Sequence, residues 1–599
     1  PSSISFSGPE IHILRSRCVD FACTPLPIGT GVLGVSYRRL RQLGQLDSKA
    51  RRERVNGMEL LRALDIHDDS ARHFLPVIPS AQGLIASIQS LKKPLVLVTA
   101  STRRAEELAA EIRTYIGQKV VEFPPWETLP HERLSPKSDT VVARYKVLYQ
   151  LRNDKKIRVI VTSVRALIQP LIPGLNVTEP LEIELEQTIS IQNLIEKLSA
   201  FGYQRTDLVE RRGDFAVRGG IVDLFPADFE HPIRVDFFGD EIEDISYFLI
   251  SDQRSYQPVS GKVLIFPARE ILLTQEIKER ARYLAAEFPQ VKEIANKVAE
   301  GIVVEGMESL AAALVGHMQN FHDVIPQDFD FVLVDSPRIT SRAMDLRRTN
   351  EEFLEAAWSH AAIGAEAPID LSNELSSGGY FTLEEMRNSS SQREWRNLDA
   401  YSDEFETSDF LEFPHFKGDI NKALQQIESW IQEGYLLIFS APGAGTIERF
   451  QQIFVEEGIP TRVQLDIDGS LTRGTLYLTI TPIEHGYIYP KSKTVIFTEK
   501  DLSGKRTSTK DAPRMPSRRK KSIDPLELRA GDFVVHEQHG VGRYVELVQR
   551  NVGGISREYL VIEYASSKRG QPGDRLFVPT DTLEQVTRYV GGEAPALHR

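Results

Sequence analysis

The sequence predicts a multidomain α/β protein that combines a parallel-sheet domain, an antiparallel domain inserted into it, a small α/β domain and a C-terminal β-barrel. Three observations support this fold class. Two short apolar segments, 94–100 and 157–162, flank a segment with helical periodicity, which is typical of a parallel sheet. Segments 211–226 and 233–242 alternate apolar and polar residues, which predicts paired antiparallel strands. Residues 526–590 hold short strands between turn sequences, which predicts a small barrel of the SH3 or Tudor type.

The expected domain boundaries follow the changes of pattern along the chain. Residues 1–75 contain helical stretches but no motif, so they stay unassigned. The remaining segments are, in order, the first part of the parallel-sheet domain (76–176), the antiparallel domain (177–265), the second part of the parallel-sheet domain (266–362), a linker (363–409), the small α/β domain (410–500), a basic linker (501–525) and the barrel (526–592).

Length and composition indicate a globular protein. The 599 residues suffice for about four domains. No apolar run is long enough to span a bilayer, and the N-terminus lacks the layout of a signal peptide. We therefore expect a cytoplasmic protein with no membrane partner. Cys18 and Cys23 are the only cysteines, which excludes a disulfide framework and a four-cysteine zinc site, so both are expected to be free thiols.

The formal net charge of −12 argues against DNA binding by the whole surface. Two basic clusters, within 38–54 and 505–521, are the places where local contact with nucleic acid is conceivable. The second cluster is also rich in Ser, Thr, Gly and Pro, which predicts a flexible linker. A solvated segment without a ligand is the simpler interpretation of both clusters.

The antiparallel domain contains residues that packing does not explain. Its apolar alternation leaves Arg218, Arg234 and Phe238 on the surface side of the two strands. Arginine beside an exposed aromatic residue is the composition of a protein-binding hot spot. The alternative is a solvated sheet with ordinary surface charges.

A family resemblance favours the first interpretation. The residues Tyr203-x-Arg205, Arg212-Gly213-x-Phe215-x-Val217-Arg218-Gly219 and Phe237-Phe238-Gly239-Asp240-Glu241-Ile242 resemble domain 2 of the excision-repair protein UvrB. The same domain occurs in the bacterial transcription-repair coupling factors (Mfd). In both families it binds UvrA, and the resemblance implies that Arg218, Arg234 and Phe238 are the contact residues.

The C-terminal segment carries a second, separate resemblance. Gly531-Asp532, His539-Gly540-Val541-Gly542, Glu558-Tyr559-Leu560 and Phe577-Val578-Pro579 resemble the RNA-polymerase-interacting domain of the coupling factors, which is similar to CarD. This implies that the barrel edge around Arg550 and Phe577 binds the β subunit of RNA polymerase. Arg550 departs from the apolar residue that the family often carries there.

The parallel-sheet domain resembles the first motor-like domain of UvrB, split around domain 2. Ser80 stands where the phosphate-binding lysine should be, and residues 75–82 contain no glycine. The magnesium motif reads Val334-Asp335-Ser336, without its glutamate. The resemblance therefore implies a degenerate nucleotide site at Ser80 and Asp335 that cannot hydrolyse ATP. The short segment between Trp126 and Ile157 leaves little room for the damage-probing hairpin of UvrB.

Two further motifs have simpler explanations. The residues Gly443-Ala444-Gly445-Thr446 precede a helix but lack the lysine and spacing of a phosphate loop, so a tight turn is expected. His536 and His539 have metal-ligand spacing, yet no further Cys or His lies nearby in sequence, so no metal is expected.

Together these features predict the adaptor half of a coupling factor, linking stalled RNA polymerase to UvrA. The sequence ends at Arg599 with no helicase motif after Thr587, so we expect the motor, with its ATP, magnesium and most DNA contacts, to be absent from this chain. A monomer without a bound cofactor is expected. Two alternatives stay open: a UvrB-like ATP-dependent excision-repair enzyme, and an architectural DNA-binding protein that uses the basic linker.

Overall fold

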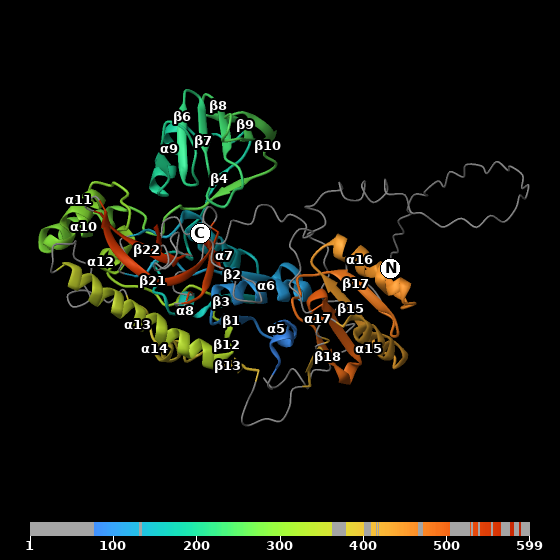
Figure 1. Ribbon diagram of the computed structural model, residues 1–599. Coiled ribbons are helices and arrows are strands. Elements are labelled where there is room, and N and C mark those ends of the chain that lie inside the picture. The colour runs from blue at the N-terminus through green and yellow to red at the C-terminus, as the bar shows by residue number, and fades with distance from the viewer. Residues whose placement is uncertain are drawn as a thin grey trace, which may run out of the picture. The chain divides into compact units, whose positions relative to one another are not determined.

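The computed structural model describes residues 77–130, 134–361, 379–400, 409–414, 416, 419–464, 471–503, 528, 531–536, 540–552, 555–564, 575–579 and 586–588. Both cysteines, the first basic cluster and nearly all of the basic linker therefore lie outside the described residues, as does His539. The described part contains a mixture of helices and strands in several sheets, which confirms the α/β class (Figure 1).

The first sheet is parallel throughout and has the strand order β13-β12-β1-β3-β2. Its central strands consist mainly of Val, Leu and Ile and are buried on both faces, as a parallel sheet between helices requires. The strands are β1 (Leu95–Thr99), β2 (Val120–Phe123), β3 (Val159–Ser163), β12 (Asp330–Val334) and β13 (Trp395–Leu398). The segments expected as strands at 94–100 and 157–162 thus become β1 and β3.

Helices flank this sheet, and several of them make up much of the second part of the domain. Their bounds are α5 (Gln82–Ser90), α6 (Thr102–Ile116), α7 (Ser138–Asn153), α8 (Val164–Ile168), α10 (Gln275–Glu287), α11 (Lys292–Ala299), α12 (Ala311–Val315), α13 (Ser336–Ala361) and α14 (Leu383–Ser389). Short 3-10 turns are η1 (Pro79–Ala81), η2 (Gly117–Lys119), η3 (Pro289–Val291), η4 (Met307–Leu310) and η5 (Phe321–Asp323). The helix α14 and the strand β13 lie in the segment expected as a linker, where β13 pairs with the edge of β12.

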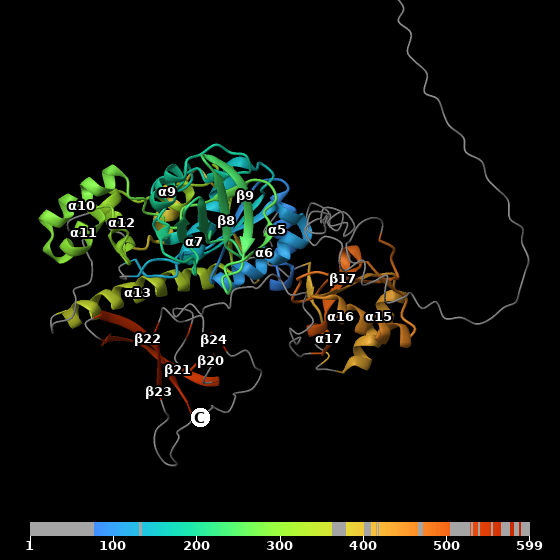
Figure 2. The same ribbon diagram turned by 90° about the horizontal axis from the view of Figure 1, so that it is seen from above.

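Between the two parts of this domain the chain forms a sheet that is antiparallel except for its edge strand β5, which pairs parallel with β6; Figures 1 and 2 show it from two sides. Its order is β10-β9-β8-β7-β6-β5, and β4 and β11 form a separate pair. The helix α9 (Ile191–Ala200) packs on one face through Leu194 and Leu198. The strands are β4 (Leu181–Ile183), β5 (Gln204–Arg205), β6 (Asp214–Arg218), β7 (Ile221–Leu224), β8 (Ile233–Phe238), β9 (Glu241–Phe248), β10 (Ser255–Pro258) and β11 (Val263–Ile265).

The small α/β domain has a sheet of order β14-β18-β19-β15-β17-β16. One face packs against α15 (Ile420–Gln432), α16 (Ala444–Glu456) and α17 (Glu499–Ser503). The motif Gly443 to Thr446 is the start of α16. The strands are β14 (Leu411–Glu412), β15 (Leu436–Ala441), β16 (Thr461–Val463), β17 (Leu476–Ile480), β18 (Tyr487–Tyr489) and β19 (Thr494–Thr498), with η6 (Pro490–Ser492) between the last two.

The other face of this sheet is covered by helices of the parallel-sheet domain. Ile438, Tyr487 and Ile496 share one buried cluster with residues of α5 and α6. Inside this contact the hydroxyl oxygens of Tyr115 and Tyr487 are hydrogen-bonded at 3.2 Å. The small domain therefore completes its second apolar layer with helices that lie more than 300 residues earlier in the sequence.

The C-terminal sheet is antiparallel, with the order β23-β22-β21-β20-β24. Val534, Leu560, Ile562 and Val578 form its apolar core. Among the described residues β23 and β24 remain the two edges, so the sheet is established and a closed barrel is not. The strands are β20 (Phe533–His536), β21 (Gly540–Val552), β22 (Ile555–Glu563), β23 (Arg575–Pro579) and β24 (Val586–Arg588).

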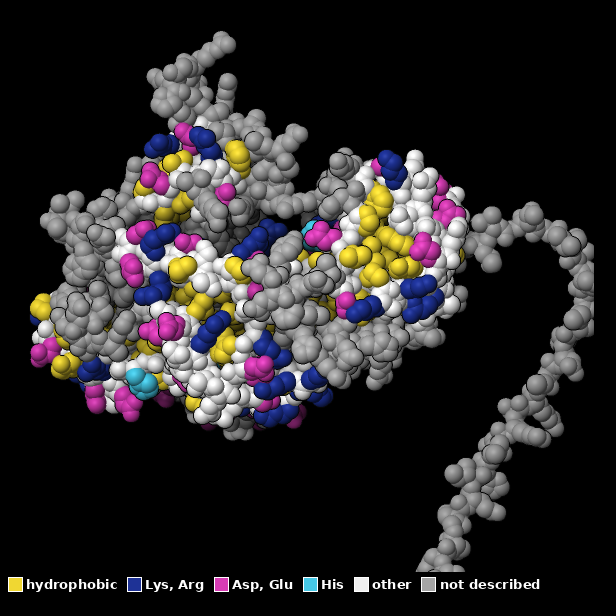
Figure 3. Space-filling view, turned by 90° about the horizontal axis from the view of Figure 1, so that it is seen from below, with side chains coloured by type: hydrophobic (Ala, Val, Ile, Leu, Met, Phe, Trp, Pro, Cys, Tyr) yellow, Lys and Arg dark blue, Asp and Glu magenta, His cyan; other side chains and the backbone are white. Residues whose placement is uncertain are grey.

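The surface carries both signs of charge. On the face in Figure 3, Lys and Arg side chains are interspersed with Asp and Glu, and hydrophobic side chains form smaller groups between them. No helix within the described residues combines the length and the apolar character that crossing a bilayer requires.

Candidate functional site

The antiparallel sheet presents one apolar face and one polar face. Phe215, Val222 and Val235 point into the core beneath α9. Because side chains alternate along a strand, the residues between them lie on the other face, which we call the open face. Direct strand pairing places Asp223 beside Arg234, and Arg234 beside Ser246.

Asp223 connects two arginines on the open face. Its Oδ1 atom accepts a hydrogen bond from Arg234 Nε at 2.7 Å, and its Oδ2 atom accepts from Arg234 Nη2 at 3.0 Å. The same Oδ2 atom accepts from Arg218 Nη2 at 2.9 Å. The Asp223 side chain is only 1% exposed, so the carboxylate lies below its two partners. A bidentate pair of this kind fixes the plane of the Arg234 guanidinium.

The two arginines differ in how much of them faces solvent. Arg234 also donates from Nη1 to the Gln253 carbonyl oxygen at 3.1 Å, and its guanidinium lies 5.0 Å from the Phe248 ring centre. The hydrogen bonds to Asp223 raise the pKa of Arg234 above its ordinary value. The Arg218 side chain is 48% exposed, so much of its guanidinium remains accessible to a partner.

Phe238 stands at the hairpin end of the open face and is 78% exposed. It ends β8, and Gly239 turns the chain with a φ of 65°, a backbone conformation that favours glycine. An aromatic side chain this exposed gains little from folding, because most of its apolar area stays in water. The structure thus brings Arg218, Arg234 and Phe238 onto one face, together with Asp223, which the sequence analysis did not single out.

Positions 550 and 577 lie in the C-terminal sheet, on the two strands that flank β22. Position 550 pairs with 557, and position 577 pairs with 561. Positions 557 and 561 are four residues apart on one strand, an even spacing, so the register places positions 550 and 577 on the same face of the sheet.

The start of α5, next to Ser80, and the start of α13, next to Asp335, meet at the end of β13. The Leu398 carbonyl oxygen accepts hydrogen bonds from Asp335 N and from Gln82 Nε2, both at 3.2 Å. Asp335 itself has a φ of 67° and forms an ion pair with Arg338 at 3.1 Å. The next residue, Ser336, donates from its backbone N to Asp399 at 2.6 Å at the start of α13.

The groups around the start of α5 bind one another. Arg104 donates to the Pro79 carbonyl oxygen and to Gln82 Oε1, each at 3.3 Å, and to Glu111 at 3.0 Å. The Glu111 carboxylate lies against Gly83, where a Cβ atom would come within 2.8 Å of Oε2. Burial raises the pKa of Glu111, while Arg104 opposes that shift. A side-chain carboxylate therefore lies beside the first turn of the helix where a phosphate-binding loop would hold phosphate.

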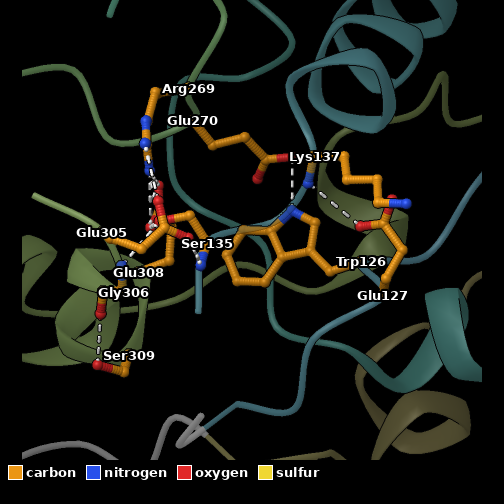
Figure 4. Close-up of polar contacts among 10 residues, drawn as sticks. All are labelled: Trp126, Glu127, Ser135, Lys137, Arg269, Glu270, Glu305, Gly306, Glu308 and Ser309. Carbon is orange, nitrogen blue, oxygen red and sulfur yellow. Dashed lines mark hydrogen bonds and ion pairs between the residues drawn. The ribbon is translucent and has the colours of Figure 1, made fainter. Parts of the chain in front are cut away.

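A second polar cluster anchors the loop between β2 and α7 (Figure 4). Trp126 Nε1 donates to Glu270 at 2.9 Å, and the fully buried Arg144 pairs with the same carboxylate at 2.7 Å. Ser135 contacts Glu308 and Arg269, and Ser135 N donates to Glu305 at 2.9 Å. These contacts join the chain before the inserted domain to the chain after it. The adjoining cavity, of about 20 Å³, has room for a single water molecule.

No group of three or more His, Cys, Asp or Glu residues with metal-binding geometry occurs in the described part of the chain. The described residues offer three candidate sites: the open face of the antiparallel sheet, the face of the C-terminal sheet that carries positions 550 and 577, and the closed edge near Ser80 and Asp335.

Comparisons with known proteins match two segments of the chain. Residues 181–271 match the family described as the UvrB interaction domain, and residues 528–590 match the family described as the CarD-like/TRCF RID domain. The transcription-repair-coupling factor of Mycobacterium tuberculosis is 40% identical over 549 residues, which cover 87% of this chain and 44% of the relative. That of Escherichia coli is 27% identical over 533 residues, covering 84% and 44% respectively.

The chain thus spans less than half the length of the curated relatives that it matches. The two domain matches occur in the order that the sequence analysis expected, with the first around the open face and the second around the C-terminal sheet. Over most of its length the chain is thus similar to transcription-repair-coupling factors, and it carries two domains that match families named for UvrB interaction and for the CarD-like/TRCF RID domain.

Proposed function

We propose that this chain is the adaptor half of a coupling factor, which links stalled RNA polymerase to UvrA in transcription-coupled nucleotide excision repair. The observation that carries this proposal is the open face, where Arg218 and Phe238 are exposed within the segment that matches the UvrB interaction domain. The match at residues 528–590 supports the polymerase end of the link.

The open face suits an acidic and apolar partner surface. The exposed part of Arg218 is available to a carboxylate of UvrA, and Phe238 fills an apolar pocket on the partner. Arg234 contributes its positive charge from a fixed position, because Asp223 and the Gln253 carbonyl hold its guanidinium. Arginine and aromatic residues of this kind each contribute about 2 kcal/mol or more at an interface centre.

The C-terminal sheet supplies the second docking surface. It curls into a small barrel of the SH3 or Tudor type, and the edge around Arg550 and Phe577 binds the β subunit of RNA polymerase. The shared face of positions 550 and 577, given by the strand register, supports this assignment.

The parallel-sheet domain acts as a scaffold that does not hydrolyse ATP. Three features support this: Ser80 in place of lysine, the pairing of Asp335 with Arg338, and the Glu111 carboxylate beside the first turn of α5. The chain needs no cofactor and works as a monomer; ATP, magnesium and the main DNA contacts belong to the motor domains of the family.

Binding of purified UvrA to this chain, measured by biolayer interferometry, tests the open face. We expect Phe238→Ala and Arg218→Glu each to weaken binding at least tenfold, which is about 1.4 kcal/mol. Tyr283→Ala is the matched control, because Tyr283 is also exposed but lies on α10, outside the antiparallel domain. Unchanged affinity in both open-face variants would overturn the proposal. Arg234→Glu is less informative, because it places a carboxylate against Asp223 and disturbs the sheet.

A further inference from the structure

The helices α10 and α11 form a hairpin in the second part of the parallel-sheet domain, and Figures 1 and 2 show them side by side. Apolar residues on both helices join the main core of that domain: Ala281, Leu284, Ala285, Ala295 and Val298. Only the short connection around η3 links the helices, so they run antiparallel. The end of α11 therefore lies close to the start of α10.

A groove lies between the two helices and has a volume of about 460 Å³. Its lining comprises Gln275, Lys278 and Arg282 from α10, and Asn296, Ala299 and the C-cap residue Glu300 from α11. Residues three, four and seven apart share one side of a helix, which explains why these residues converge. Every lining side chain except that of Ala299 is polar or charged, so the groove suits a polar ligand.

Two positive charges in the groove have no partner within the part of the chain that the structure describes. Neither Lys278 nor Arg282 forms a side-chain hydrogen bond or an ion pair with a described residue. Other cations of the same helices are occupied. Arg280 donates to the Ala313 carbonyl oxygen at 2.9 Å, and Lys297 forms an ion pair at 2.8 Å within α11. The groove thus presents two cations that are available to a ligand.

Acidic residues are mostly kept away from these cations. Glu300 is the one carboxylate among the lining residues, and it lies at the end of the groove where Gln275 begins α10. Glu279 accepts a hydrogen bond from Gln275 Nε2 at 2.8 Å. Helical spacing places Glu276 and Glu287 on the opposite side of α10. The hairpin therefore separates its charges, and the groove side is the positive one.

A third cation extends the row. Lys292 begins α11 and lies one turn before Asn296, which places it on the same side of that helix as this lining residue. Because the hairpin is antiparallel, Lys292 follows Arg282 along the groove. Lys278, Arg282 and Lys292 thus form a row of positive charge with Glu300 at one end, and we call this arrangement the basic groove.

The spacing of the row favours an extended polyanion over a small ion. Lys278 and Arg282 are four residues apart, which is about 6 Å along the axis of α10. Successive phosphates advance by about 3.4 Å along each strand of a DNA duplex, so two nucleotides cover a similar distance. A single phosphate ion would contact one or two of the three cations and leave most of the groove to water.

We propose that the basic groove binds the phosphodiester backbone of DNA, through Lys278, Arg282 and Lys292. The lining contains no aromatic side chain on which a base could stack, so the contact is to phosphate and independent of sequence. The formal net charge of −12 opposes DNA binding by the rest of the surface, which makes the contact local. The groove is separate from the open face, so the inference does not depend on UvrA docking.

Fluorescence anisotropy of the chain with a labelled duplex of about 20 base pairs tests the proposal, at salt concentrations from about 0.05 to 0.2 M. We expect Lys278→Ala/Arg282→Ala to bind at least fivefold more weakly at the lowest salt concentration. The slope of log affinity against log salt should become shallower by about 2, because each phosphate contact contributes about 0.9. Duplexes of unrelated sequence should show the same loss.

Arg347→Ala/Arg348→Ala is the matched control, because both arginines are exposed on α13 and their removal changes the net charge equally. This variant should bind DNA within twofold of the wild type. Any contribution of the basic linker is common to all variants. An equal loss in both double variants, or no loss in Lys278→Ala/Arg282→Ala, would overturn the proposal. Thermal unfolding followed by circular dichroism checks folding, and Lys278→Gln/Arg282→Gln repeats the test if the alanine variant is unfolded.

Two measurements identify the source of the phosphate. Isothermal titration calorimetry with inorganic phosphate should show no saturable binding with a dissociation constant below about 1 mM. Tighter binding that Lys278→Ala/Arg282→Ala abolishes would make the groove a site for a free anion and overturn the proposal. The same variant should bind UvrA within twofold of the wild type, and a tenfold loss would assign the groove to a protein partner instead. If the open-face variants fail to affect UvrA binding, the DNA result still stands.

Discussion

The open face of the antiparallel sheet and the edge of the parallel sheet at Ser80 both contain an arginine held by a carboxylate, yet they have opposite properties. On the open face, Asp223 is buried and its two arginines reach the surface. At the sheet edge, Arg104 and Glu111 bind each other and the first turn of α5. On the open face, the Asp223 carboxylate holds Arg218 and Arg234 where a partner can contact them. At the sheet edge the same chemistry closes a site that a ligand would otherwise occupy.

The largest expected effect comes from removing the carboxylate that organises the open face. Asp223→Ala should lower the free energy of unfolding by about 1–3 kcal/mol, because two arginines lose their charged hydrogen bonds, and should weaken UvrA binding more than tenfold. Urea unfolding and calorimetry measure the two effects. Asp244→Ala is the control, since Asp244 is exposed on the same sheet and should change stability by less than about 0.5 kcal/mol. Wild-type affinity in Asp223→Ala would show that the arginines need no positioning.

Phe238→Ala should separate binding from stability. The side chain is 78% exposed, so its loss should change the free energy of unfolding by less than about 0.5 kcal/mol while costing at least tenfold in UvrA affinity. Urea unfolding of the same sample that is used for binding provides the comparison. A large loss of stability would mean that Phe238 packs within the protein and does not serve as a free anchor.

Glu111→Gln should change how stability depends on pH. Burial raises the pKa of Glu111 in the folded protein above its ordinary value of 4.5, so the folded state holds this proton more tightly than the unfolded state. Stability should therefore fall as pH rises from 4.5 towards the folded pKa. The variant lacks this titration, so its stability relative to the wild type should improve over that window. Urea unfolding at about pH 4.5, 5.5 and 7 measures the difference. If the difference in unfolding free energy between variant and wild type is the same at all three pH values, the pKa of Glu111 is not raised in the folded protein.

The smallest expected effect is on ATP hydrolysis. The chain should release phosphate from ATP at the rate of buffer alone, and Asp335→Ala should leave that rate unchanged, because the site at Ser80 lacks its lysine and is lined by Glu111. A coupled phosphate-release assay with magnesium detects any turnover. A rate above background that Asp335→Ala abolishes would favour the UvrB-like enzyme instead.

The sequence pattern predicted the regular parts of the fold well. Continuous apolar runs became β1 and β3, and strict alternation placed Arg218, Arg234 and Phe238 on one face. These features depend on local spacing alone, so a single sequence carries them. The two domain resemblances were likewise confirmed by the family matches.

Features that depend on distant partners were not predictable in the same way. The strand β13 contains only two apolar residues, Trp395 and Leu398, and it exists because the edge of β12 offers it hydrogen bonds. Asp223 was overlooked because a single acid within a strand resembles an ordinary surface residue until its cross-strand neighbour is known. Gln253 was missed for the same reason, since only the fold brings its carbonyl oxygen to Arg234.

The cover that α5 and α6 provide for the small α/β domain has a consequence for engineering. In a chimera that exchanges only residues 410–500 between two coupling factors, the sheet of one protein would pack against helices α5 and α6 of the other. Tyr487 would then face the residue that the other protein has in place of Tyr115. Such chimeras should pack poorly at this contact unless α5 and α6 are exchanged together with residues 410–500.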